Sequence, residues 1–280
     1  MNDFLLGNAD TIRLAFFVGV FAVMALWEAL APRRRRAFGR LRRWPSNIGI
    51  VVLNTLTLKI ALPVAAVEFA ATGTARGWGL LAAVDLPFWV EFLLAVVILD
   101  FAIYLQHVMF HAVPALWRLH RMHHADLDFD VTTGARFHPV EILLSMVIKF
   151  AAIAALGPPA VAVLVFEILL NGTAMFNHAN ARLPLRLDRW LRWIVVTPDM
   201  HRVHHSVVPH ETNSNFGFNL PWWDRLFGTY RDQPAAGHEG MTIGLNRFRD
   251  ASELRLDRLL LQPLRGEASD YPINRRGGPG

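Results

Sequence analysis

Four apolar stretches occupy the first two thirds of the chain, separated by polar turns. The first runs from about Thr11 to Leu30 and the second from about Ile48 to Ala71, and each is long enough to cross a bilayer. The third keeps a helical pattern from Pro87 to His111, and its 25 residues would extend about 37 Å, more than the hydrocarbon core requires. The pattern predicts an all-α integral membrane protein with about four transmembrane helices.

A proline-rich break divides the fourth apolar stretch. Gly157-Pro158-Pro159 separates arms of about Glu141 to Leu156 and Ala160 to Phe176, each near the lower limit for spanning. The arms form either a helical hairpin that crosses the membrane or one that only dips into it. In both cases the chain returns to the face on which the third stretch ended.

Positive charge indicates the orientation of these stretches. Seven arginines follow the first stretch: Arg33, Arg34, Arg35, Arg36, Arg40, Arg42 and Arg43. Because such clusters mark cytoplasmic loops, we expect the N-terminus outside and the C-terminus inside. A secretory signal carries its charges ahead of the apolar run, so the first stretch is predicted to remain as an anchor. The arginine-rich, lysine-poor composition favours a bacterial protein, and hence the inner membrane.

Composition narrows the chemistry. The 280 residues are 53% hydrophobic and contain no cysteine, which leaves imidazole and carboxylate as the strong metal ligands. The net charge of +5 lies beside apolar stretches, which disfavours nucleic-acid binding. We expect one membrane domain over residues 1–280, with a disordered tail at 274–280.

Eight histidines fall into three groups in the polar segments. They are His107 and His111, then His120, His123 and His124, then His201, His204 and His205. Positions i, i+3 and i+4 share a helix face, so each His-x-x-His-His triplet is predicted to direct three imidazoles to one point. One ion commonly takes three or four protein ligands, so eight histidines indicate two metal ions, or one ion with crowded surroundings. The isolated His210 and His238 are predicted to be ordinary structural residues.

Further motifs accompany the three boxes in order along the chain. They are Phe137-His138-Pro139-Val140-Glu141, Asn177-His178-Ala179-Asn180, Thr197-Pro198-Asp199-Met200-His201 and Trp223-Asp224-Arg225-Leu226-Phe227-Gly228-Thr229-Tyr230. Boxes and motifs together resemble the signature of the fatty acid hydroxylase and sterol desaturase superfamily of membrane di-iron oxygenases. The resemblance covers residues 90–230, which we take as the motif core.

The resemblance implies a ligand set within a cytoplasmic, histidine-rich cap. The implied metal ligands are His107, His111, His120, His123, His124, His178, His201, His204 and His205. The side chains expected to orient these ligands are Asp100, His138, Glu141, Asn180 and Asp199, and for His138 a direct ligand or a helix-entry residue are the alternatives. Two positions depart from the family pattern: Val108 replaces a frequent arginine, and Ala174 replaces a histidine found in some fatty acid hydroxylases.

The same resemblance implies two iron ions, with zinc as the alternative in purified protein, and dioxygen as co-substrate. Hydroxylation or desaturation of a lipid C–H bond is the implied reaction. The chain has no Gly-x-Gly-x-x-Gly fingerprint and no cysteine for an iron–sulfur cluster, so a separate ferredoxin, cytochrome or reductase must supply electrons. The lipid remains open among fatty acyl lipids, sterols or hopanoids, ether lipids and carotenoids.

Two other classes of function fit an all-histidine site. A zinc-dependent membrane hydrolase is one, although no His-Glu-x-x-His motif is present. A metal transporter or b-type cytochrome is the other, but transport predicts ligands near the membrane midplane rather than at one surface.

Overall fold

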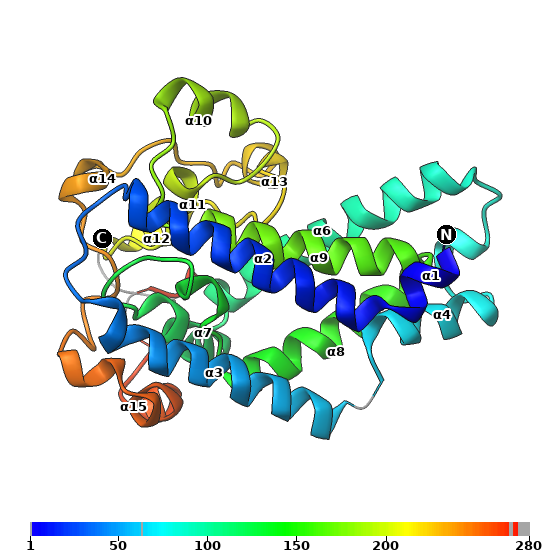
Figure 1. Cartoon of the computed structure of the whole chain (residues 1–280), viewed down its shortest axis with the longest axis horizontal. Coiled ribbons are helices and arrows are strands. Elements are labelled where there is room, and N and C mark those ends of the chain that lie inside the picture. The colour runs from blue at the N-terminus through cyan, green and yellow to red at the C-terminus, as the bar shows by residue number, and fades with distance from the viewer. Residues whose placement is uncertain (1, 63, 269–270, 274–280) are drawn as a thin grey trace.

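The computed structural model describes residues 2–62, 64–268 and 271–273, and these are helical with no β-strand among them. Long helices form a bundle, and short helices gather into a cap at one end of it, on the left of Figure 1. The N-terminus lies at the opposite end of the bundle from the cap. The predicted tail at 274–280 lies outside the described residues.

The bundle consists mainly of long apolar helices. They are α2 (Ala9–Leu30), α3 (Arg40–Ala61), α6 (Phe88–Ala112), α8 (Pro139–Leu156) and α9 (Ala160–Asn177), with the short α1 (Asn2–Gly7), α4 (Ala66–Ala75) and α5 (Gly79–Ala82) at the far end. Five helical stretches among the described residues are long and apolar enough to cross a membrane. They include both arms of the fourth apolar stretch, which forms a helical hairpin. The predicted all-α integral membrane fold is confirmed.

The second apolar stretch differs from the prediction. It was expected as one helix from about Ile48 to Ala71, but α3 begins at Arg40 and ends at Ala61, and α4 starts anew at Ala66. Proline at position 63 has no backbone N–H to continue the helix, which accounts for the break. Three of the seven arginines therefore belong to the first turns of α3.

A pair of glycines brings the hairpin turn against the start of α5. Gly157 ends α8 with a φ of +67°, and a Cβ there would lie 1.8 Å from the carbonyl oxygen of Trp78. Gly79 faces it with a φ of +84° and would place a Cβ 2.2 Å from the Gly157 nitrogen. Both positions require glycine because of their backbone conformation and this close approach.

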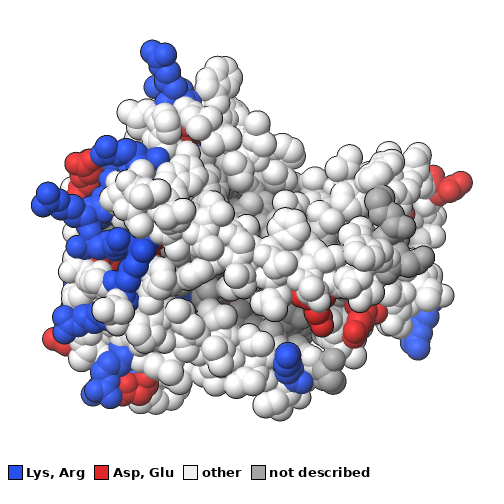
Figure 2. Space-filling model, viewed as in Figure 1, with Lys and Arg blue, Asp and Glu red and all other residues white. Residues whose placement is uncertain are grey.

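The cap consists of α7 (Pro114–His124) and short helices late in the chain. These are α10 (Leu185–Leu191), α11 (Pro198–His204), α12 (Pro209–Thr212), α13 (Trp222–Leu226), α14 (Gly237–Gly240) and α15 (Leu256–Leu261). Three 3-10 turns complete it: η1 (Thr133–Ala135), η2 (Ala251–Leu254) and η3 (Gln262–Leu264). Lys and Arg side chains gather over the cap, whereas on the face shown in Figure 2 the bundle carries fewer charged side chains, which lie along its lower edge and at its far end.

The arginine segment is tied into the cap by ion pairs. Arg43 is fully buried, bonds both oxygens of Asp126 at 2.7 and 2.8 Å, and reaches Asp130 at 2.5 Å. Arg33 bonds Asp199 at 3.0 Å, and Arg40 bonds Glu28 at 3.2 Å. These internal bonds show that part of the arginine segment has a structural role in addition to its position beside an apolar stretch.

Candidate metal centre

Four segments bring nine histidines together inside the cap. The last turns of α6 carry His107 and His111, α7 carries the first triplet, His178 caps the end of α9, and α11 with the next residue carries the second triplet. All nine side chains are buried. Local sequence fixes where the two box helices start: Pro114 opens α7, and Thr197 caps α11 by accepting a bond from the Met200 N–H.

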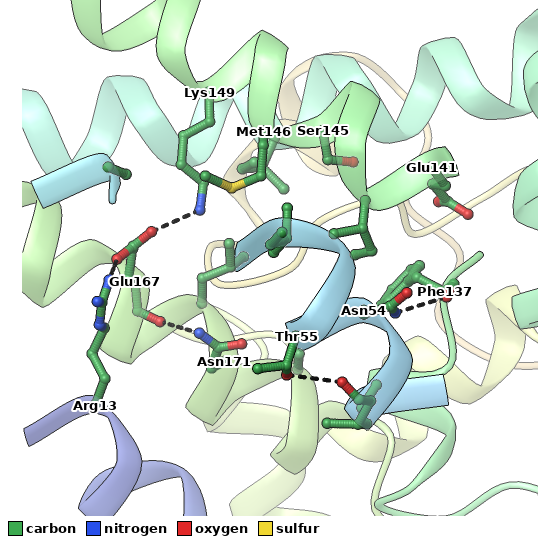
Figure 3. Close-up of a pocket in the computed structure, with 18 of the residues that line it drawn as sticks. Arg13, Asn54, Thr55, Phe137, Glu141, Ser145, Met146, Lys149, Glu167 and Asn171 are labelled. Carbon is green, nitrogen blue, oxygen red and sulfur yellow. Dashed lines mark hydrogen bonds and ion pairs between the residues drawn. The ribbon is translucent and has the colours of Figure 1, made fainter. Parts of the chain in front are cut away.

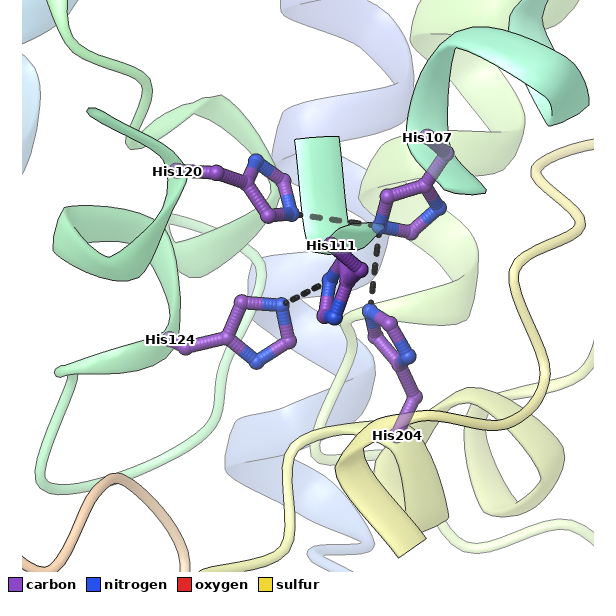
Figure 4. A group of neighbouring side chains, drawn as sticks. All are labelled: His107, His111, His120, His124 and His204. Atoms are coloured by element: carbon purple, nitrogen blue, oxygen red, sulfur yellow. Dashed lines mark hydrogen bonds between the residues drawn. The ribbon is translucent and has the colours of Figure 1, made fainter. Parts of the chain in front are cut away.

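The nine histidines separate into two clusters. One consists of His107, His111, His120, His124 and His204 (Figure 4), and the other of His123, His178, His201 and His205. Within each cluster the candidate ligand nitrogens all lie within 4.8 Å of one another. Each cluster could hold a metal ion, in line with the prediction of two metals.

The prediction that each triplet converges on one point is wrong. His120 and His124 share a cluster while His123 belongs to the other. The second triplet behaves in the same way, since His201 and His205 stay together and His204 crosses over. At about 100° per residue, positions i and i+4 differ by about 40° around a helix, whereas i+3 points about 60° to the other side. Each of the two triplets, on α7 and at α11, therefore supplies ligands to both clusters.

Spacing of the Nε2 atoms fits a shared ion. His107 lies 3.1 Å from His120 and 3.0 Å from His204 between Nε2 atoms. In the other cluster, His178 lies 3.1–3.2 Å from His123, His201 and His205. Two nitrogens each about 2.1 Å from one ion and at right angles around it are about 3.0 Å apart. The donor set and its spacing therefore fit two metal ions.

The second ring nitrogen of five histidines has a defined acceptor. The Nδ1 of His107 donates to the Phe216 carbonyl at 2.7 Å, and that of His204 to the Ser214 carbonyl at 2.7 Å. His178 donates to the Ala174 carbonyl at 2.7 Å. A histidine that donates from Nδ1 keeps its Nε2 lone pair for a metal.

Side chains accept the corresponding bonds of the other two histidines. His120 Nδ1 lies 2.6 Å from Glu141 Oε1, and His111 Nδ1 lies 3.1 Å from Asn213 Oδ1. Asn213 in turn donates its amide N–H to the Tyr271 carbonyl at 2.6 Å, which leaves its oxygen facing His111. The carboxylate–histidine pair is the arrangement that typically orients a metal ligand.

Burial keeps the cap histidines uncharged. Burial, and then the surrounding imidazoles, hold the pKa of His123, His124 and His201 well below the ordinary value. Burial lowers the pKa of His120 to about 3. Neutral imidazole is the form that binds metal, so the clusters are ready for ions at neutral pH.

The other residues expected to orient ligands have different partners. Asp100 accepts bonds from Trp223 Nε1 at 2.8 Å and the Leu220 N–H at 3.3 Å. His138 caps α8 by accepting from the Val140 N–H.

Asn180 and Asp199 connect the cap to the arginine segment instead. Asn180 exchanges bonds with the Arg34 backbone at 2.9 and 3.1 Å, while Asp199 pairs with Arg33 and Arg202. Among the described residues, Glu141 is thus the one candidate of the five that bonds a cluster histidine.

Sequence reasoning missed the acceptors contributed by the main chain. The carbonyls at positions 174, 214 and 216 carry no residue-type signal, because any amino acid supplies one. Asn213 had a side-chain signal but stands outside the motifs. His238, predicted to be structural, is buried with its Nε2 3.5 Å from Asp199 and joins neither cluster.

A cavity of about 800 Å³ leads from the histidines into the bundle. His107 and His120 line one end together with Phe110, Phe137 and Phe218. The opposite part contains charged side chains, among them Arg13, Lys149 and Glu167 (Figure 3). A volume of this size suits a small-molecule or lipid ligand.

Sequence comparison provides independent information on the same region. Residues 92–229 match the family described as fatty acid hydroxylase, a span that includes all nine histidines. An ornithine lipid hydroxylase of Rhizobium tropici is 32% identical over 151 residues, which cover 53% of this chain and 44% of that protein. An alkylglycerol monooxygenase of Xenopus tropicalis is 30% identical over 154 residues, covering 53% of this chain and 32% of that protein.

A more distant relative is methylsterol monooxygenase 2-2 of Arabidopsis thaliana, 25% identical over 158 residues, covering 55% of this chain and 59% of that protein. The chain spans less than half the length of the two relatives named first. No solved structure matches this chain.

Proposed function

Because the chain contains a fatty acid hydroxylase domain at residues 92–229, we propose that it is a membrane di-iron oxygenase that hydroxylates or desaturates a lipid C–H bond. The observation that carries the proposal is the pairing of two buried all-histidine clusters with a cavity that His107 and His120 line directly. We treat residues 1–280 as one membrane domain built around this motif core.

The proposed cofactors are two iron ions, with zinc as the alternative in purified protein. The nine cluster histidines would hold them, five around one ion and four around the other. Iron would supply the activation of dioxygen, the co-substrate, that an unactivated C–H bond requires. The chain orients the imidazoles through Glu141 and backbone carbonyls, and its aromatic wall at Phe110, Phe137 and Phe218 keeps water away from the reacting carbon.

The substrate is proposed to be a membrane lipid. The names of these relatives refer to an ornithine lipid, an alkylglycerol and a methylsterol, and these share an extended apolar body with a polar end. Such a molecule enters an apolar cavity from the bilayer without crossing water. The reaction therefore falls on a carbon held near His107 and His120.

Electrons are proposed to come from a separate ferredoxin, cytochrome or reductase on the cytoplasmic face. The cap carries the exposed cationic side chains that an acidic donor would meet (Figure 2). We propose a bacterial inner-membrane location, with the N-terminus outside and both histidine clusters and the C-terminus inside.

The function is tested by lipid mass spectrometry of cells that express the wild-type chain, His123→Ala or His210→Ala under isotope-labelled dioxygen. The wild type is expected to yield a lipid carrying one labelled oxygen, or one lighter by two hydrogens. His123→Ala should abolish that product, whereas His210→Ala should not, because His210 is exposed and outside both clusters. Product from His123→Ala at the wild-type level would contradict the ligand assignment.

Metal analysis separates the oxygenase from a zinc hydrolase. Protein purified after iron-replete expression should contain two irons per chain without haem absorbance. Zinc alone under those conditions, with no oxidised lipid in the cells, would instead favour the hydrolase.

A further inference from the structure

A group of ionised side chains lies inside the bundle, away from the histidine clusters. Lys149 Nζ lies 2.9 Å from Glu167 Oε1, and Arg13 Nη1 lies 2.5 Å from Glu167 Oε2 (Figure 3). Lys149 and Glu167 lie inside α8 and α9, and Arg13 lies in the second turn of α2. Ionised groups within membrane-spanning helices are costly, and they commonly mark a path or site for a ligand.

Cations outnumber the buried carboxylate in this ion-paired group. Two cations share the Glu167 carboxylate, which is 8% exposed, while the second partner of Arg13, Asp10, is 93% exposed to solvent. Lys149 is only 13% exposed, and among the described residues its ammonium has one acceptor for three N–H donors. Two cations therefore share one buried carboxylate, and the Lys149 ammonium keeps unused donors that suit a ligand rich in anionic oxygen, while Asp10, the other partner of Arg13, also lines the cavity.

The charged group lines the same cavity as two histidines of the five-histidine cluster. Arg13, Lys149 and Glu167 line the same cavity as His107 and His120. Glu141, the partner of His120, precedes Lys149 by eight residues on α8, a rise of about 12 Å. An extended chain covers that distance in on the order of ten bonds. Apolar side chains such as Met146 and Ile142 line the interval.

We propose that Arg13 and Lys149 bind the anionic oxygen group of an amphiphile, a carboxylate or a phosphate ester. They thereby select which carbon of its chain reaches the histidine clusters. The consequence for regiochemistry rests on the proposed function, but the binding does not. The rival explanation is an ion pair that only fastens α2 to α8 and α9.

Binding of three twelve-carbon probes to the purified full-length chain tests this proposal. Dodecanoate and dodecyl phosphate carry the two anionic groups, and 1-dodecanol is the neutral match. Both anions should bind the wild type at least about tenfold more tightly than the alcohol, a difference of about 1.4 kcal/mol. The tighter of the two anions identifies the headgroup chemistry. Equal affinity for the alcohol and both anions would overturn the proposal.

Variants distinguish a binding site from a structural ion pair. Lys149→Met should weaken both anions about tenfold and leave dodecanol unchanged. Lys59→Met is the matched control, because Lys59 lines the same cavity from α3 but is exposed. An equal loss of anion affinity in the two variants would show that any positive charge near the cavity has this effect, and would refute a binding site at Lys149.

A third variant covers the case in which Lys149→Met does not fold. Glu167→Gln frees both cations, so it should strengthen binding of the anionic probes several-fold, whereas a mere ion pair predicts no gain. All binding is measured without dioxygen or reductant. If the chain binds dodecanoate as expected but oxidises no lipid, the binding site stands and the proposed function is wrong.

Discussion

Individual histidines are oriented mainly by groups that cannot titrate near neutral pH. His107, His178 and His204 donate from Nδ1 to backbone carbonyls, and His111 donates to a side-chain amide. Glu141 is the ionisable acceptor in this set of five bonds. A change at Glu141 therefore alters the ligand character of one histidine while leaving the others in place.

Replacing Glu141 with glutamine tests this local effect. Glutamine retains an oxygen for the His120 N–H but removes the charge that strengthens the imidazole as a ligand, so we expect metal affinity at the five-histidine cluster to fall about 10–100-fold. Competition with graded chelators, followed by metal analysis, should show one ion lost well before the other. Simultaneous loss of both ions from Glu141→Gln would contradict separate clusters.

Gly134 controls the position of His178 through a close approach. A Cβ at this position would lie 2.6 Å from the Ala174 carbonyl oxygen and 3.1 Å from His178 Nδ1. Gly134→Ala should therefore displace the bond between those two groups and weaken metal retention at the four-histidine cluster.

The control is Gly172→Ala on α9, where a Cβ would meet Val20 at 4.0 Å, an ordinary contact. Metal content and thermal unfolding of the two purified variants provide the comparison. Equal metal retention in both would show that the chain at Gly134 moves aside without cost.

Residue type determined what could be predicted at this scale. Eight of the nine cluster histidines were identified because imidazole is a ligand in its own right and its spacing is visible in the sequence, whereas His178 was named only through the family resemblance. The way each triplet divides between clusters required helix directions. Glu141 stands beside its histidine as expected, whereas Asp100, Asn180 and Asp199 bond elsewhere, because charge and proximity in sequence do not specify a partner across the fold.

At the scale of elements, one buried ion-pair network fastens α3 to the segment after α7. Asp126 bonds Arg43 and lies 3.1 Å from Arg136, and all three are buried. Burial alone would raise the pKa of Asp126, but the guanidinium groups of Arg43 and Arg136 hold it well below the ordinary value. The network therefore links a membrane helix directly to the loop that positions the metal ligands.

Asp126→Asn should destabilise the protein by about 3–5 kcal/mol, because it leaves buried guanidinium charge uncompensated. Thermal unfolding in detergent measures the loss, and Asp257→Asn, in an exposed pair with Arg255, should change the stability far less. A similar small cost for both would show that water or another group compensates Arg43.

The pH dependence of this network has a defined sign. A carboxylate whose folded pKa lies below its unfolded value adds stability above that unfolded value, about 3.9, and loses it as pH falls further. The stability gap between wild type and Asp126→Asn should therefore be full at pH 7 and narrow below about pH 4. A gap that persists under acid would assign the loss to packing rather than charge.

Sequence patterns predicted most elements well where the signal was local. The hairpin was foreseen because Gly157-Pro158-Pro159 interrupts an apolar run. The break between α3 and α4 was missed because apolar residues continue on both sides of position 63, and hydropathy outweighed a single proline. The role of Arg43 could not be predicted without its carboxylate partners, which follow 83 and 87 residues later in the chain.

At the scale of the whole molecule, charge is segregated along the long axis. Cationic side chains concentrate over the cap, and most of the bundle surface between the cap and the far end carries no charge apart from groups along its lower edge (Figure 2). This distribution predicts that the cap and the far end of the bundle lie on opposite sides of the membrane.

Single-cysteine labelling checks that orientation, since the chain has no cysteine of its own. A membrane-impermeant maleimide should label Arg255→Cys, in the cap, only in inverted vesicles. It should label Arg76→Cys, beside α4, only in intact spheroplasts. Labelling of both from one side would rule out the proposed topology, and the cysteine-free parent provides the background.

Participation of α11 in both clusters has a consequence for biogenesis. His204 completes one cluster, and His201 and His205 belong to the other, yet α11 leaves the ribosome 77 residues after the first triplet. The α8–α9 hairpin must insert in between. Because ligand sets and folding are coupled, we expect neither cluster to enclose its metal fully before α11 has emerged. Metal loading is therefore expected to follow synthesis of most of the chain, and metal supply would then limit the amount of loaded protein rather than its synthesis.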